Sequence, residues 1–209
     1  MITKSGIIEL KELYNFVEND VDGEALDANS RKGREFSKVV TNLTNSIPEI
    51  GGFYIWGSYL TNGLWRNIYI GKAGFNKTAS LQNRIKKELN AERQFFWKIK
   101  LTNDQIINKC KDNYPKMAHK YEWHWERSFE KFNSTHIIWV SINDSDKNEF
   151  EKDILMIESD LIETMNPTAN RSRPKPYGNL QENTIEIIKK IKELIHKNRP
   201  DKPFIPLEK

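Results

Sequence analysis

Apolar and polar residues alternate along the chain in patterns that predict a mixture of helices and short strands. Apolar residues recur at close to helical spacing in residues 7–20, 30–47, 81–100, 149–165 and 181–197. Compact apolar runs predict strands at 53–56, 68–73 and 136–142. Asn62–Gly63 lies between the first two strands and predicts that they form a hairpin. The order of elements favours an α+β fold with a small sheet.

Three regions follow from this order of elements. We expect a helical N-terminal arm at residues 1–50, a central core at 51–171, and a basic link with a C-terminal helix at 172–209. Residues 102–134 mix polar and aromatic side chains and predict an insertion with some helix before the third strand. We interpret the tryptophan-rich stretch 121–129 of this insertion as packing, with a dimer contact or a DNA-groove contact as alternatives.

Composition and charge narrow the function classes. The mean hydropathy is −0.72, and no apolar run approaches the roughly 18 residues of a membrane span. We see no leader pattern, and Cys110 is alone in the chain, so we expect a cytoplasmic protein that binds no membrane and forms no intramolecular disulfide. The net charge is +4, with a local charge of −5 over residues 1–30 and +5 over 171–209. This asymmetry is compatible with nucleic-acid binding.

The predicted hairpin and the segments after it carry the residues of greatest chemical interest. GGFYIW places Tyr54 on the first strand, and NIYIGKAG places Tyr69 and Lys72 on the second. A helix with Arg84 comes next, and after the third strand the stretch ILMIESDLIETMNPTAN contains Glu158 and Asn170. Each motif alone also fits packed aromatics or exposed charges on a surface, so it is their joint order that points to a function.

This set resembles the GIY-YIG nuclease superfamily over residues 51–171, with GFY in place of GIY and an intact YIG. YIGKA is also similar to the hairpin of the incision subunit of nucleotide excision repair. The resemblance implies a three-stranded antiparallel or mixed sheet flanked by helices. Chain length, N-terminal arm and insertion most resemble the type II restriction endonucleases of the superfamily, which bind double-stranded DNA and typically act as dimers.

The resemblance implies six catalytic residues, namely Tyr54, Tyr69, Lys72, Arg84, Glu158 and Asn170. Arg84 offers a planar, permanently charged fork that suits a scissile phosphate. We favour Tyr54 as the general base that activates water, with Lys72 as the cation that lowers its pKa from about 10. Tyr69 would then orient water or phosphate.

Glu158 and Asn170 complete the expected site. A single carboxylate completed by water and phosphate suits Mg²⁺, so we expect Glu158 to bind Mg²⁺, with Mn²⁺ as a substitute. Asn170 would position the active-site backbone or a phosphate. Glu88 departs from the family, which often has His or Tyr one helical turn after the arginine, and it could pair with Arg84 at i, i+4.

Basic residues outside these motifs are candidates for phosphate contacts, although each also suits a solvated surface. They are Lys86, Lys87 and Arg93 after Arg84, and Arg171, Arg173 and Lys175 after Asn170. The sequence therefore predicts a Mg²⁺-dependent endonuclease acting on double-stranded DNA. The alternatives are a structure-selective or non-specific nuclease of repair or phage defence, and a DNA-binding module without activity.

Overall fold

The computed structural model describes residues 2–113, 131, 133–143, 147–170 and 182–206. Its strands are β1 (Ile2–Glu9), β2 (Gly52–Tyr59), β3 (Trp65–Ala73) and β4 (His136–Ile142). Its α-helices are α1 (Lys11–Asn19), α2 (Arg31–Thr44), α3 (Leu81–Ala91), α4 (Asn103–Asn113), α7 (Lys147–Met165) and α8 (Glu182–Lys197). Three short 3₁₀ segments are η1 (Glu24–Leu26), η2 (Lys77–Ala79) and η3 (Arg93–Ile99).

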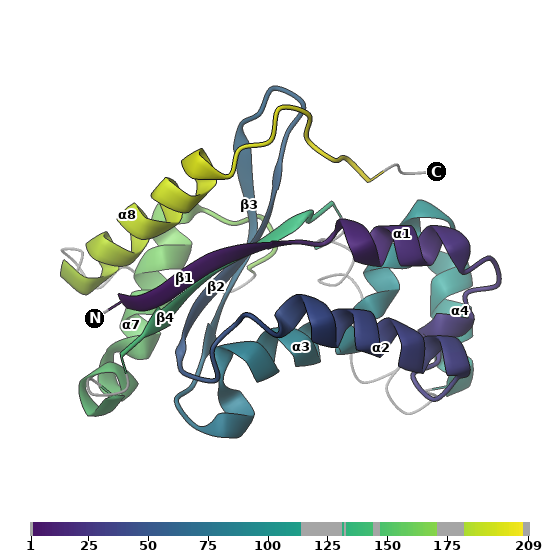
Figure 1. Cartoon of the computed structure of the whole chain (residues 1–209), viewed down its shortest axis with the longest axis horizontal. Helices are drawn as coiled ribbons and strands as arrows, with labels where there is room; N and C mark the ends of the chain where they lie inside the picture. The colour runs from purple at the N-terminus through teal and green to yellow at the C-terminus, as the bar shows by residue number, and fades with distance from the viewer. Residues whose placement is uncertain (1, 114–130, 132, 144–146, 171–181, 207–209) are drawn as a thin grey trace.

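The strands form one sheet in the order β1-β4-β2-β3, and all neighbours are antiparallel (Figure 1). The chain therefore has the predicted α+β fold, but the sheet has four strands rather than three. The hairpin is confirmed, because β2 pairs with β3 and Gly63 adopts a positive φ of 75° at its tip. With β3 at one edge of the sheet, one side of that strand is available to other segments.

The additional strand is β1, in the region expected to be a helical arm. Residues 7–20 were predicted to be helical, yet the chain is extended as far as Glu9 and helix α1 begins only at Lys11. Gly6 lies against Trp139 of β4, where a Cβ would come within 2.7 Å of the indole ring. Glycine and β-branched residues disfavour a helix here, and pairing with β4 supplies the backbone hydrogen bonds instead.

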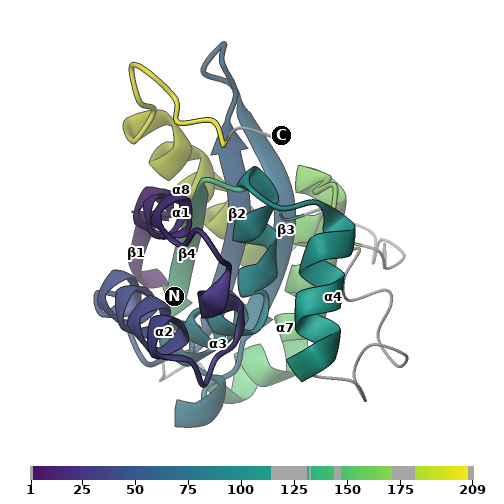
Figure 2. The ribbon, with the colours of Figure 1, turned by 90° about the vertical axis from the view of Figure 1, so that its right-hand side faces the viewer.

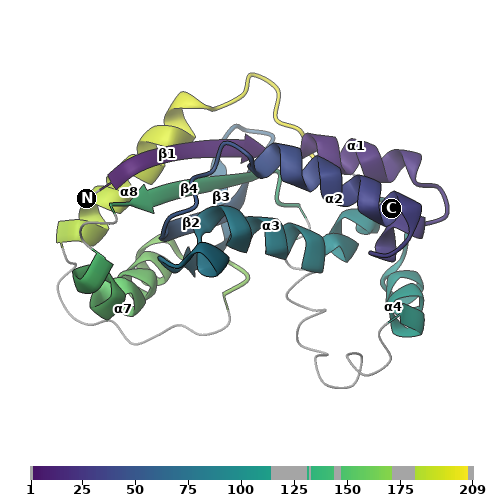
Figure 3. The same cartoon turned by 60° about the horizontal axis from the view of Figure 1, so that its bottom comes forward.

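Helices cover both faces of the sheet, and this explains why its central strands β2 and β4 are buried at every position. Tyr54 and Trp56 point into a cluster with residues of α1, α2, α3 and η3, whereas Phe53 and Ile55 point into a cluster with α7 and α8. Figures 2 and 3 show the two groups of helices on opposite sides of the sheet. Because side chains alternate along a strand, neighbouring residues of the hairpin face different helices.

The predicted helix 81–100 is two elements in the structure. Helix α3 ends at Ala91, and the chain continues as the 3₁₀ segment η3. Phe95, Phe96 and Trp97 are consecutive and all fully buried. A regular surface helix would turn part of such a run toward solvent, so the change of geometry allows the whole run to join the core.

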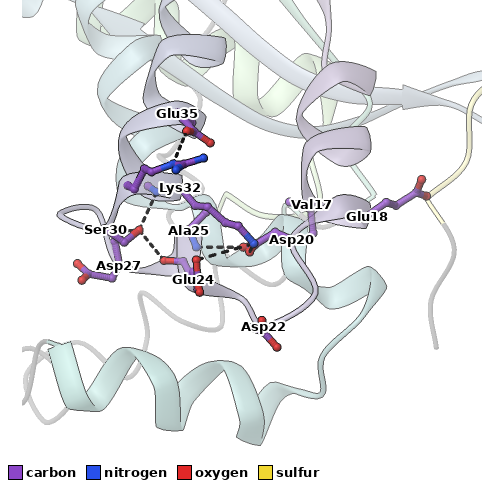
Figure 4. Close-up of polar contacts among 12 residues, drawn as sticks. Val17, Glu18, Asp20, Asp22, Glu24, Ala25, Asp27, Ser30, Lys32 and Glu35 are labelled. Atoms are coloured by element: carbon purple, nitrogen blue, oxygen red, sulfur yellow. Dashed lines mark hydrogen bonds and ion pairs between the residues drawn. The ribbon is translucent and has the colours of Figure 1, made fainter.

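The acidic N-terminal loop between α1 and α2 has a structural role. Asp20 is buried, accepts a hydrogen bond from the amide of Ala25 at 3.0 Å, and pairs with Lys32 Nζ at 3.2 Å (Figure 4). The hydrogen bond to Asp20 raises the pKa of Lys32. Ser30 caps α2 by accepting from the amide of Gly33. Lys32 thus neutralises part of the negative charge of residues 1–30 where that charge is partly buried.

Candidate active site around strand β3

The hairpin register sets the two tyrosines side by side on the face toward α3. Tyr54 is paired with Gly71 and Trp56 with Tyr69, and the two tyrosine rings lie 6.4 Å apart. The ring of Tyr54 crosses the backbone of Gly71, where a Cβ would come within 2.4 Å of both Cζ and Oη. The glycine of YIG is therefore required by the packing of Tyr54 rather than by backbone conformation.

The hydroxyl of Tyr54 is held by two charged residues of α3. It donates to Glu88 Oε1 at 2.5 Å and accepts from Arg84 Nε at 3.3 Å. Arg84 Nε also pairs with Glu88 Oε1 at 3.1 Å, which is the expected i, i+4 contact. The side chain of Arg84 remains 42% exposed, and no described residue accepts a hydrogen bond from its two terminal amino groups. Arg84 is therefore fixed through Nε, and its planar end stays accessible.

The surroundings of Tyr54 contradict its expected activation by Lys72. Tyr54 is 1% exposed, and burial raises its pKa well above 10, with the negative charge of Glu88 adding to the increase. Lys72 contributes no contact to the hydroxyl, because it lies three positions after Tyr69 on the strand and points to the opposite face of the sheet. The expectation of a lowered pKa for Tyr54 was wrong.

Lys131 is a part of this site that the sequence did not reveal. It comes from the region before β4, its side chain is fully buried, and its Nζ pairs with Glu88 Oε2 at 3.2 Å and Glu92 Oε2 at 2.6 Å. The same ammonium lies 4.0 Å from the centre of the Tyr69 ring. In sequence, a buried lysine looks the same as a surface lysine, so only the departure at Glu88 hinted at a charged partner.

The buried charges of this group support one another. Burial would lower the pKa of Lys131, but Glu88 and Glu92 together raise it above its usual value. Burial would likewise raise the pKa of Glu88, but Lys131, the hydrogen bond from Tyr54, and Arg84 keep it below its usual value. Both groups are therefore charged at neutral pH, and each depends on the other for that state.

Lys72 and Glu158 form a second group on the other face of β3. Their side chains meet at 2.6 Å between Nζ and Oε2, and they are 30% and 22% exposed. Lys72 is paired with Phe53, which packs toward α7, and Glu158 lies on α7 itself. The pair therefore combines a carboxylate and an ammonium at the surface, each accessible to a ligand from solvent.

Asn170 fastens the chain after α7 to the edge of β3. Its Oδ1 accepts from the amide of Ile70 at 2.8 Å, and its Nδ2 donates to the carbonyl of Ile70 at 2.9 Å. The amide of Ala169 donates to Ile68 in the same way at 2.7 Å. Asn170 thus contacts the backbone of β3 within the candidate site, and the described hydrogen bonds along this edge end at Ile70.

All six predicted catalytic residues converge on the four-residue segment 69–72, but they do so from different sides. Tyr54 crosses Gly71 and holds Arg84, Glu158 binds Lys72, and Asn170 binds Ile70. The tyrosines and Arg84 lie on the α3 face, and Lys72 and Glu158 lie on the α7 face. A molecule that contacts both groups must meet them across the edge of β3.

The predicted phosphate-binding residues differ in whether the structure exposes them, buries them or does not describe them. Lys87 is exposed on α3 and Lys86 is half-buried, so both remain candidates. Arg93 is a correction, because it is buried and donates to the carbonyl oxygens of Asn90 and Ala25. Its guanidinium also lies 5.5 Å from the centre of the Phe36 ring, so it stabilises the interior rather than the surface. The remaining three candidates, Arg171, Arg173 and Lys175, lie outside the described residues.

Glu158 is the accessible carboxylate of this site that could bind a metal ion. Among the described residues, no three His, Cys, Asp or Glu side chains gather into a metal-binding cluster. Glu88 and Glu92 are already paired with buried Lys131. Mg²⁺ needs only one or two carboxylates, since water and phosphate complete its shell, and a partly exposed Glu158 meets that requirement. Lys72 competes for one of its two oxygens.

Comparisons with protein-family models, curated proteins and solved structures find no match for this chain. Among the described helices, none has the length and apolar character needed to cross a membrane. A cavity of about 410 Å³ between β1 and α8 is lined by residues 2–5 and by four charged residues of α8, and it contains none of the predicted site residues. The geometry around β3 therefore carries the functional argument.

Proposed function

We propose that the protein is a Mg²⁺-dependent endonuclease that hydrolyses phosphodiester bonds of double-stranded DNA, most similar to type II restriction endonucleases of the GIY-YIG superfamily. The observation that carries this proposal is the convergence on residues 69–72 of β3. Arg84 is linked to this segment through Tyr54, Glu158 is bound to Lys72, and Asn170 is bound to Ile70. Segments up to 100 residues apart thus contribute groups suited to phosphate and metal binding.

The scissile phosphate lies at the edge of β3 beside Gly71 in this proposal. The described hydrogen bonds along this edge end at Ile70, and Lys72, two positions further on, is partly exposed. From this position a phosphate reaches the exposed end of Arg84 on one face and Glu158 on the other. Arg84 binds two phosphate oxygens through its terminal amino groups, because Nε is already used.

Each remaining residue has a defined task in this arrangement. Tyr54 orients Arg84 instead of taking a proton, since its hydroxyl is buried and donates to Glu88. Tyr69, whose ring centre lies 4.0 Å from the ammonium of Lys131, orients the attacking water or the phosphate. Glu158 would hold a Mg²⁺ ion, which would polarise the phosphoryl group and stabilise the leaving oxygen.

One observation favours a second candidate, a DNA-binding module without activity. Lys72 already pairs with Glu158 at 2.6 Å, so the charge that would hold a metal ion is satisfied within the chain. A binding module needs only the basic surface and Arg84. The two candidates differ in whether the bonds of DNA are broken.

The test is incubation of the protein with plasmid DNA and Mg²⁺. Discrete bands support a sequence-specific endonuclease, a smear supports a non-specific nuclease, and intact plasmid supports the binding module. Arg84→Lys should lower cleavage by about 10²-fold, because an ammonium replaces a two-pronged contact with a point charge. Arg66→Lys, at an exposed position of strand β3, is the matched control and should cleave normally. Equal activity of both variants would contradict the role of Arg84.

A further inference from the structure

Glu88, Glu92 and Lys131 form a buried charge network next to Tyr54 and Arg84. The sequence motifs do not include Glu92 or Lys131. Glu92 and Lys131 are buried next to Glu88, and Lys131 binds both carboxylates. Lys131 is separated from Glu88 by 43 residues of the chain. Glu88 in turn contacts both the Tyr54 hydroxyl and Arg84 Nε.

We propose that Lys131 is a positioning residue of the active site: its ammonium holds the Glu88 carboxylate, and Glu88 holds Arg84 and Tyr54. The role of Arg84 in cleavage rests on the proposed function. The positions of the side chains do not, since they are set by contacts of 2.5 to 3.3 Å. Lys131 therefore controls the phosphate-binding arginine through Glu88 rather than by touching substrate.

The balance of buried charge explains why Lys131 is needed. Glu88 is buried and pairs with two cations, Lys131 and the partly exposed Arg84. Without Lys131, Glu88 keeps only Arg84, and a buried carboxylate that loses a cationic partner takes up a proton more readily. A protonated Glu88 has less negative charge at Oε1, the atom that Tyr54 and Arg84 both use.

This reasoning gives a dependence on pH that a purely structural role lacks. The groups that face Glu88 are Tyr54 from β2, Arg84 from its own helix and Lys131. Glu92 and Tyr69 also contact Lys131, and they therefore affect Glu88 indirectly. In the wild type these cations keep the pKa of Glu88 below its usual value, so Glu88 does not titrate near neutral pH. In Lys131→Met, the effect of burial on Glu88 outweighs that of the remaining cation, so the pKa of Glu88 rises. Glu88 is then protonated at neutral pH and should lose its proton only at higher pH.

The experiment compares Lys131→Met with Lys190→Met, which removes a lysine from an exposed pair with Glu193. Cleavage by Lys131→Met should fall by about 10²-fold at pH 7, as expected for a displaced catalytic group, and recover as pH rises toward 9. Lys190→Met should cleave like the wild type at every pH. A second readout is the ¹H–¹⁵N resonance of Arg84 Nε, which should be resolved in the wild type and lost in Lys131→Met at pH 7.

A compensated variant covers the case in which Lys131→Met does not fold. Lys131→Met with Glu92→Gln removes one cation and one carboxylate, so Glu88 keeps Arg84 as its partner. This double variant should melt at a higher temperature than Lys131→Met and regain the Arg84 resonance.

Three results are decisive. A folded Lys131→Met with the wild-type Arg84 resonance and cleavage overturns the proposal. Lost cleavage with an unchanged pH profile also overturns it, because Lys131 would then only support the fold. If the wild type itself fails to cleave, the proposed function fails, and the Arg84 resonance alone still decides the role of Lys131.

Discussion

Gly71→Ala tests the packing on which the site depends. A Cβ at this position would lie 2.4 Å from Cζ and Oη of Tyr54. Gly71 is not among the glycines with positive φ, so the backbone itself accepts alanine. The substitution therefore acts on one neighbour, the ring that holds Arg84 through its hydroxyl.

The size of the effect follows from two opposing contributions. Replacing glycine by alanine at an unstrained position stabilises a protein by about 0.4 to 1 kcal/mol through the unfolded chain. Forcing an extra methyl group into packed surroundings costs about 1 to 3 kcal/mol. We expect net destabilisation, and each kcal/mol lowers the melting temperature of a protein of this size by roughly 2 to 4 °C. Cleavage should fall by about 10²-fold, because the ring carries Arg84 with it.

Thermal melts of four proteins isolate the contact: wild type, Gly71→Ala, Tyr54→Ala and the double variant. In the Tyr54→Ala background the ring is absent, and Gly71→Ala should be neutral or stabilising by up to about 1 kcal/mol. The coupling free energy between the two positions should be about 1 to 3 kcal/mol. Equal destabilisation of Gly71→Ala in both backgrounds would refute the explanation of this glycine by Tyr54.

Three further predictions concern other parts of the molecule. Asn170→Ala removes two hydrogen bonds to Ile70 and should lower the free energy of unfolding by about 1 to 3 kcal/mol in a denaturant titration. Burial lowers the pKa of His136 to about 4, so its contribution to stability is complete above pH 6.5 and declines as pH falls from 6.5 to 4. Melting temperatures at pH 7 and pH 5 should therefore differ more for the wild type than for His136→Gln. Replacing the three basic residues of 171–175 with alanine should reduce the slope of log affinity for DNA against log salt by about 0.9 per lost phosphate contact, whereas an unchanged slope would place the DNA elsewhere.

Local patterns predicted much of the fold. The hairpin was predictable because Asn62–Gly63 supplies a tight turn between two apolar runs, and helices α2, α7 and α8 follow clear apolar periodicity. Strand β1 was missed because Ile7 and Ile8 fit the spacing of the helix that follows. Only pairing with β4, more than 120 residues away, decides in favour of the strand.

The candidate site was predictable as a set of residues but not as an arrangement. The orientation of Lys72 was predictable, since it lies three positions after Tyr69 and a strand places residues at that spacing on opposite faces. The pairing of Arg84 with Glu88 was foreseeable from their spacing on a helix. The burial of Arg93 and Lys131 was not, because it depends on partners supplied by distant segments.

Glu158→Gln provides the most direct test of the central claim, that Glu158 holds the metal ion of a DNA-cleaving site. The amide keeps the shape of the side chain and removes the charge that binds Mg²⁺. Glu163→Gln, at an exposed position of the same helix, is the matched control. Nicking of a duplex is measured with Mg²⁺ and binding with Ca²⁺, after melting temperatures have been compared. The proposed mechanism predicts that Glu158→Gln loses cleavage and retains DNA binding while Glu163→Gln keeps both; near-normal cleavage by folded Glu158→Gln would contradict it.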